Sequence, residues 1–222
     1  MNNKIKNISE ACSINDEIFG LIVKNLRDKT LKTELDIDKF IRKETRKRKL
    51  KNSFPPVVAI GKNAAEIHHK PKKTRLKKGF LVMDFGVKLN GYCSDMTRTI
   101  YIGKPLKKEK EIYNKVLQAQ KIGIQKSKIG AECFEIDYAV RKKLKGLREN
   151  FIHSLGHGVG KKIHELPNLS PKTDSILKKG DIITIEPGVY IKGKLGIRIE
   201  DSILIDKKIK VLTKSTKKLI II

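Results

Sequence analysis

The stretch VMDFGVKLNGYCSDMTRT, residues 82–99, contains the pattern that decides the fold. Apolar residues lie on both sides of Asn90 and Gly91, the dipeptide most typical of a two-residue type I′ turn between antiparallel strands. The run GFLVMDF that leads into this stretch is apolar enough to indicate a buried strand. We therefore predict a long β-hairpin that turns at residue 90.

The predicted hairpin brings two carboxylates together. A turn at this point pairs position 84 with 97 and position 86 with 95, so Asp84 and Asp95 point to the same face, diagonal to each other. Gly86 lies opposite Asp95, and we expect open space there. Two carboxylates on an apolar face are costly unless a positive charge lies between them, and a metal ion supplies that charge. Two solvent-facing acids are the alternative.

Periodic patterns on both sides of the hairpin predict two helices followed by strands, twice. Thr33 with Asp36 three residues later predicts the start of the second helix. The first round comprises helices at 5–27 and from 34 to about 48, then strands within 57–61, 79–89 and 92–102. The second comprises helices at 107–128 and 134–148, then strands within 181–191, 195–205 and 210–222. This order predicts an α+β fold of two similar halves. No linker-like segment interrupts it, so we expect a single domain over residues 1–222.

Composition sets broad limits. Hydrophobic residues make up 39% and charged residues 33%, which indicates a globular protein rather than a disordered one. No apolar run approaches the ~18 residues of a membrane span, and the first residues contain no apolar secretory segment, so we expect a cytoplasmic protein. Three cysteines without CxxC spacing are expected to be free thiols. The net charge of +26 comes mostly from evenly spread lysines, so we expect a solvated basic surface rather than a nucleic-acid site.

A histidine cluster provides candidate partners for the two aspartates. The segment FIHSLGHGVGKKIHELPNLS, residues 151–170, contains three of the chain's five histidines. Two further carboxylates, Glu186 and Glu200, follow apolar strand-like runs. Oxygen ligands with imidazole favour Mn²⁺, Fe²⁺ or Co²⁺ over a thiolate-rich zinc site. Four carboxylates carry a charge that two divalent ions would balance.

These motifs resemble those of the pita-bread metallopeptidases, the creatinase/aminopeptidase fold of methionine aminopeptidase, Xaa-Pro aminopeptidase and prolidase. The matching segments are DFG with GYCSDMTRT, HSLGHGVG, IEPGVY and GIRIED. The resemblance implies two similar helix-helix-strand halves around a site for two divalent metal ions, with manganese favoured and cobalt or iron as alternatives. It assigns five metal ligands: Asp84, Asp95, His157, Glu186 and Glu200.

The resemblance also implies roles for other residues. His164 and Glu186 are expected to be catalytic, Glu186 as the base and His164 as a hydrogen-bond donor to the oxyanion, with His153 as a second donor. His68 is expected to close the substrate pocket. Arg198 is expected to orient Glu200 or contact substrate, with a simple salt bridge as the alternative. His69 is expected to be a surface residue.

The implied function is a metallo-aminopeptidase that acts on peptides with a free N-terminus. Motif details favour the Xaa-Pro branch, including dipeptides, and methionine aminopeptidase is the alternative. The N-terminal domain usual in the Xaa-Pro branch is not expected, which leaves a homodimer and strict proline selectivity open. A further alternative is a non-catalytic, nucleic-acid-binding member of the fold, which the intact ligand set opposes. A membrane is not an expected partner.

Overall fold

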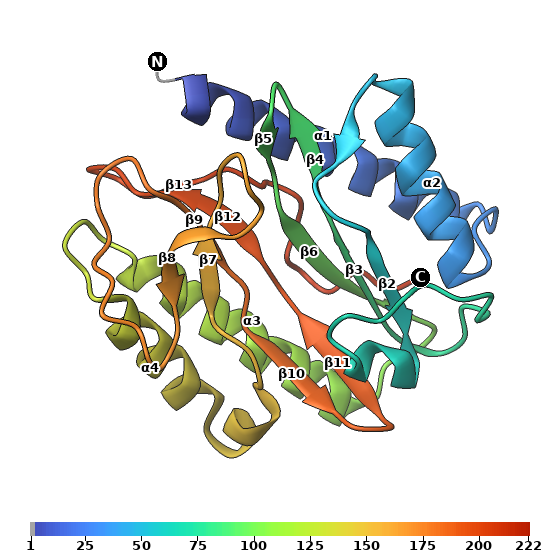
Figure 1. The fold of residues 1–222 in the computed structure, drawn as a ribbon. Helices are drawn as coiled ribbons and strands as arrows, with labels where there is room; N and C mark the ends of the chain where they lie inside the picture. Colours follow the sequence, from blue (N-terminus) through green and yellow to red (C-terminus); the bar gives the residue numbers. More distant parts are fainter. Residues whose placement is uncertain (1–2) are drawn as a thin grey trace.

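The computed structural model describes residues 3–222, and its helices lie outside a central set of strands (Figure 1). Elements of the first half are α1 Asn3–Arg27, α2 Glu34–Lys47, β1 Lys51–Asn52, β2 Val57–Ile60, η1 Gly61–Ala65, β3 Gly79–Phe85, β4 Val87–Leu89, β5 Tyr92–Cys93 and β6 Met96–Ile102. Elements of the second half are α3 Lys107–Lys126, α4 Cys133–Leu144, η2 Lys145–Asn150, β7 Gly156–Gly158, β8 Glu165–Leu169, β9 Ile182–Ile185, β10 Gly188–Ile191, β11 Leu195–Arg198, β12 Asp201–Leu204 and β13 Lys210–Val211. The predicted order of two helices and then strands, twice, is confirmed.

Local sequence signals explain two of these elements. The Thr33 hydroxyl accepts a hydrogen bond from the Asp36 amide at 3.1 Å, and the Asp36 carboxylate accepts one from the Thr33 amide at 2.9 Å. This capping box begins α2, as predicted. Asn90 and Gly91 both have positive φ, at 49° and 84°, which a type I′ turn requires. The turn therefore closes the hairpin as its sequence predicts.

The register of the hairpin is the predicted one, with one correction. Asp84 pairs with Thr97 in the β3–β6 ladder. The expectation of open space at Gly86 was wrong, because a Cβ atom there would lie 1.8 Å from the Ser94 carbonyl oxygen. Glycine is required at this position because the two backbones approach each other closely.

Each helix pair covers its own group of strands. One core cluster joins α1 and α2 to β2, β3 and β6, and a second joins α3 and α4 to the strands of the second half and to Phe80 and Tyr101 of β3 and β6. The sheets have the strand orders β2-β3-β6 and β13-β12-β9-β7-β8, with smaller sheets β10-β11 and β1-β4-β5. Figure 1 shows the two helix pairs on opposite sides of these strands.

The two halves meet along β6 and the β11–β12 segment. The Glu200 amide donates to the Thr97 carbonyl at 3.2 Å, and the Thr99 hydroxyl donates to the Arg198 carbonyl at 2.7 Å. Strand ends from both halves therefore point into one region, which is where the candidate site lies.

The histidine segment, the cysteines and the helices each bear on a smaller expectation from the sequence. Strands β7 and β8 form within the histidine segment, where no strand was predicted. All three cysteines are buried and free, as predicted. Among the helices of residues 3–222, none has both the length and the apolar composition of a membrane span.

Candidate metal centre

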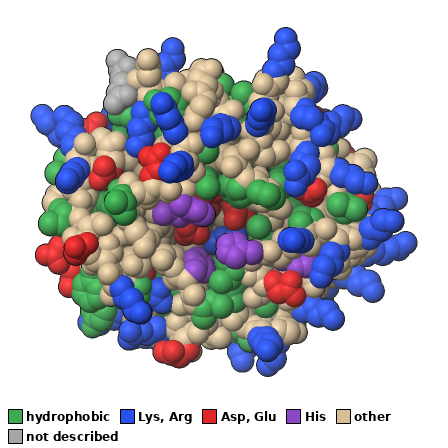
Figure 2. Space-filling view, in the orientation of Figure 1, with side chains coloured by type: hydrophobic (Ala, Val, Ile, Leu, Met, Phe, Trp, Pro, Cys, Tyr) green, Lys and Arg blue, Asp and Glu red, His purple; other side chains and the backbone are tan. Residues whose placement is uncertain are grey.

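The predicted site residues from both halves line one cavity of about 560 Å³. Figure 2 shows histidines around a hollow near the middle of one face, with acidic side chains inside it. The predicted residues on the cavity wall are Asp84, Asp95, His157, Glu186, Glu200, His68, His164 and Arg198. His153 lines an adjoining cavity that shares His68, His157, His164 and Glu186 with the first. Segments more than 100 residues apart in sequence therefore supply a single site.

His157 is oriented as a metal ligand would be. Its Nδ1 atom lies 3.0 Å from the Gly158 carbonyl oxygen, which assigns the ring proton to Nδ1 and leaves the Nε2 lone pair free. Nε2 faces Asp95 Oδ2 at 3.6 Å and Glu186 Oε1 at 3.4 Å. Burial lowers the pKa of His157 to about 4, so the imidazole is neutral and able to coordinate a cation.

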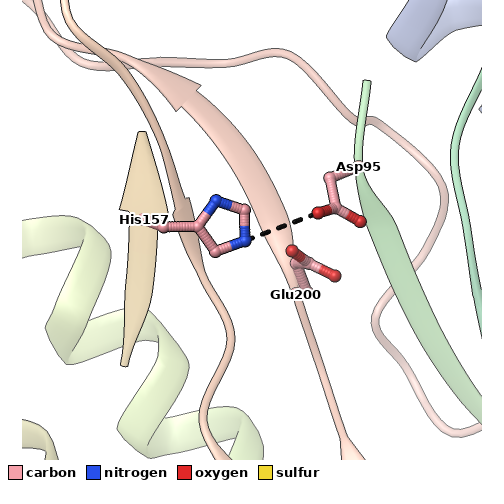
Figure 3. Close-up of side chains that lie close together, drawn as sticks. All are labelled: Asp95, His157 and Glu200. Carbon is pink, nitrogen blue, oxygen red and sulfur yellow. Dashed lines mark ion pairs between the residues drawn. The ribbon is translucent and has the colours of Figure 1, made fainter. Parts of the chain in front are cut away.

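Asp95, His157 and Glu200 form the tightest group of candidate ligands. One ligating atom from each lies within 4.8 Å of the others. Figure 3 shows the imidazole directed across Glu200 toward Asp95. Because the three side chains come from β7 and from the residues directly before β6 and β12, their meeting depends on the packing of both halves.

Two threonines hold the two candidate glutamate ligands in place. The Thr97 hydroxyl donates to Glu200 Oε2 at 2.7 Å, and the Thr184 hydroxyl donates to Glu186 Oε1 at 3.1 Å. Each hydroxyl also accepts one bond, from the Arg198 side chain and the His157 amide respectively. These contacts fix one oxygen of each carboxylate, and the threonine does not engage the other oxygen. Neither threonine stood out in the sequence, because the motif positions alone do not show which hydroxyl faces which acid.

The site holds four acids but only one arginine paired with them, Arg198, among the residues that line the cavity, and this excess of acid fits a cation site. Asp84 Oδ1 and Glu200 Oε1 are buried without a hydrogen-bond partner among residues 3–222. Burial and repulsion from Glu200 raise the pKa of Asp95, burial and repulsion from Glu186 raise that of Glu200, and burial raises that of Glu186 to about 8. Buried acids that repel one another are stable as carboxylates only beside a cation. The donor set of carboxylates and one imidazole therefore fits divalent metal ions.

Arg198 pairs with a predicted ligand. Its Nη2 atom donates to Asp84 Oδ2 at 2.7 Å, and its Nη1 atom donates to the hydroxyl of Tyr190 at 2.7 Å. Its link to Glu200 is indirect, through the Thr97 hydroxyl. The salt bridge that the sequence left as an alternative is therefore present, and it orients the Asp84 carboxylate.

Tyr190 was missed in the sequence, and it changes the role of His153. Burial raises the pKa of Tyr190 to about 12, and its oxygen accepts from Arg198, so its proton is available to His153 Nε2 at 2.9 Å. His153 Nδ1 lies 2.7 Å from the Ser154 carbonyl oxygen, and burial lowers the pKa of His153 to about 3. Both ring nitrogens are thus engaged in a neutral ring. The expectation that His153 donates to an oxyanion is not supported, because it has no free N–H.

His164 and His68 remain free to meet a ligand. Both are exposed and both line the two cavities. The His164 ring lies 4.4 Å from the His157 ring in an edge-to-face arrangement. A core histidine would be buried, so the exposure of His164 favours a role at the site.

His69 is buried at 2% exposure, so the expectation of a surface residue was wrong. Its two ring nitrogens face carboxylates, Nε2 facing Glu34 at 3.0 Å and Nδ1 facing Glu66 at 2.7 Å. Glu34, fully buried on α2, also accepts bonds from the amides of Ile60 and Lys72 and from the side chain of Asn63. One acid thus holds both ends of the loop that carries His68. This anchoring role could not be predicted from the sequence, because Glu34 has the sequence context of an ordinary acidic residue in the first turn of a helix.

We expect Glu34→Gln to lower the free energy of unfolding by about 2 kcal/mol, because one carboxylate acceptor becomes an amide donor that faces other buried donors. Glu66→Gln, at the exposed partner of His69, is the control and is expected to leave the free energy of unfolding nearly unchanged. Urea unfolding of both variants measures the difference. Equal stability of Glu34→Gln and wild type would contradict the anchoring role.

Comparison with known proteins gives consistent results. The sequence profile of metallopeptidase family M24 matches residues 6–207. The Xaa-Pro dipeptidase of Pyrococcus furiosus is 44% identical over 174 residues, which are 77% of this chain and 50% of that protein. The Xaa-Pro dipeptidase from Bacillus anthracis superposes on 100% of this chain and 63% of its own, with a TM-score of 0.94 and 39% identity. The X-Pro aminopeptidase from Thermotoga maritima superposes on 100% of this chain and 64% of its own, with a TM-score of 0.93 and 32% identity.

These likenesses confirm the expected pita-bread fold over the described residues. The chain spans between 50% and 64% of the length of the three relatives.

Proposed function

This chain belongs to metallopeptidase family M24, and on that premise we propose that it hydrolyses the bond between an N-terminal residue and a following proline. The observation that supports this most is the convergence of the five candidate ligands with His68 and His164 on one cavity. A pure binding module of this fold has no need for buried, unpartnered carboxylate oxygens. The intact acid set therefore favours an enzyme over the nucleic-acid-binding alternative.

The proposed cofactor is a pair of divalent metal ions, with manganese favoured. Asp84, Asp95, His157, Glu186 and Glu200 would hold them. Such ions lower the pKa of water and polarise a scissile carbonyl when bound. The carboxylate-rich end of the cavity also suits the free amino group of a peptide, which would restrict cleavage to the first bond.

The protein's own groups supply the proton transfers and charge stabilisation. Glu186, with one oxygen held by Thr184, is the proposed base that takes a proton from the attacking water. His164 is free to donate a hydrogen bond to the developing oxyanion. His153 acts instead as a positioning residue, because Tyr190 and Arg198 connect it to Asp84.

An apolar wall supports a substrate with proline in second position. It faces the cavity beside the acids and consists of Phe54, Pro55, Pro56, Val57, Ile67, Pro71 and Ile163. A proline ring has no N–H to satisfy and packs well against such a surface. The sequence left a homodimer open, and analytical ultracentrifugation tests it.

With Mn²⁺ added, we expect a kcat/KM at least tenfold higher for an Ala-Pro peptide than for a Met-Ala peptide of equal length. Tenfold corresponds to about 1.4 kcal/mol of transition-state preference. Release of the first residue, followed by chromatography, measures both rates on one preparation. Tenfold faster cleavage of the Met-Ala peptide would reassign the chain to methionine aminopeptidase activity, since the apolar wall also accommodates a thioether side chain.

A further inference from the structure

The cavity that holds the acid cluster also carries a second set of charges. Three further charged side chains line it, Asp38 and Arg42 from α2 and Lys70 from the loop that follows His69. The apolar wall that includes Phe54, Val57 and Ile67 completes the same cavity. The cavity thus combines a cluster of acids, an apolar wall and a second group of charged side chains with one excess positive charge.

Asp38 and Arg42 form an ion pair that engages only one of the three guanidinium nitrogens. Arg42 Nε donates to both oxygens of Asp38, at 2.9 and 3.0 Å, and Asp38 is buried. The contact uses Nε alone, so the two terminal amino groups of the guanidinium have no partner within residues 3–222. The buried Asp38 carboxylate holds the Arg42 guanidinium in position, and the terminal amino groups of Arg42 remain available to donate to a ligand.

Lys70 adds a second cation without a counter-ion. Its side chain is exposed, lines the cavity, and forms no ion pair with the described part of the chain. An ordinary surface pair explains the contact between Asp38 and Arg42. It does not explain why a half-exposed arginine and an unpaired lysine line the same cavity as the proposed metal ligands.

We propose that Arg42 and Lys70 form a subsite for a carboxylate of the substrate. This proposal rests on the proposed function and specifies the class of peptide that the enzyme takes. A planar guanidinium fork binds a carboxylate with two parallel hydrogen bonds, and Asp38 orients the fork before the substrate arrives. The carboxylate comes either from the C-terminus of a short peptide or from an acidic side chain.

Four substrates separate the two sources of the carboxylate. Ala-Pro and Ala-Pro amide differ only at the C-terminus, whereas Glu-Pro amide and Gln-Pro amide differ only in the side chain. The quantity of interest is the ratio of kcat/KM for the charged peptide to that for its neutral partner. We expect one of the two ratios to fall about tenfold in Arg42→Gln, and less in Lys70→Gln.

Two controls keep this test interpretable. Arg46→Gln removes the same charge from the exposed side of α2, and its ratios should equal those of wild type. The double variant Asp38→Asn with Arg42→Gln avoids leaving a buried acid unpaired, and its ratio should fall as far as that of Arg42→Gln. Melting curves on the same preparations show that all variants are folded.

The outcomes are distinct. A fall in the Ala-Pro ratio assigns the subsite to the C-terminal carboxylate, and a fall in the Glu-Pro amide ratio assigns it to the side chain. If neither ratio changes in Arg42→Gln, the proposal is overturned. If no peptide is cleaved, the proposed function fails, and calorimetric binding of Ala-Pro against Ala-Pro amide to wild type and Arg42→Gln still tests the subsite: equal loss of affinity for both ligands, or no loss, overturns it.

Discussion

Asp95→Asn is expected to lower kcat/KM by at least a thousandfold and to reduce the metal content of the purified protein. A thousandfold corresponds to about 4 kcal/mol of lost transition-state stabilisation. Asp95 lies in the tightest candidate ligand group, where its Oδ2 faces His157 Nε2 at 3.6 Å. An amide there removes the charge that attracts a cation and offers a weaker ligand.

The metal-free protein provides an independent readout for this variant. Burial and repulsion from Glu200 raise the pKa of Asp95, so its charged form is disfavoured when no cation is present. Without metal, Asp95→Asn should therefore be at least as stable as wild type, although its activity is lost. A merely structural aspartate would instead lose stability on replacement.

Elemental analysis, peptide hydrolysis and thermal melting on one preparation measure these effects. Asp28→Asn is a matched control, because it changes the same charge at an exposed position just after α1. Full metal content together with normal turnover in Asp95→Asn would exclude the proposed ligand role.

His164→Ala is expected to lower kcat by about a hundredfold to a thousandfold while metal content stays unchanged. The expected loss of about 3–4 kcal/mol is that of one oxyanion donor in other hydrolases. The side chain is exposed and lines both cavities at the proposed site. Its removal therefore takes away a donor without opening the core.

The melting temperature separates this role from a packing role. We expect no change in it for His164→Ala, and we expect His164→Gln to restore part of kcat because the amide retains an N–H donor. A large fall in melting temperature with normal turnover per folded molecule would show instead that His164 stabilises the fold.

Much of the fold was predictable because its signals are local. The capping box at Thr33 and the turn at Asn90 depend on residues a few positions apart, and both formed as predicted. The two rounds of helices and strands follow from periodicity in the same way. The register of the hairpin, set by the turn, also placed Asp84 opposite Thr97.

The candidate ligands could be named from motifs, but their partners could not. Thr97, Thr184 and Tyr190 have ordinary sequence contexts, and their roles depend on contacts with residues from distant segments. Strands β7 and β8 were missed for a related reason. They are short and contain glycine and proline, so pairing with β9 and with each other, rather than local propensity, makes them strands.

By itself, the sequence determined which elements form, where the hairpin turns, and which acids and histidines are available, since these depend on neighbouring residues. Only the tertiary structure decided that His69 is buried against Glu34, that His153 has no free N–H, and that Arg42 shares a cavity with Asp84. Burial and hydrogen bonding between segments far apart in sequence decide such features, because the environment of each side chain is set by which surfaces pack together.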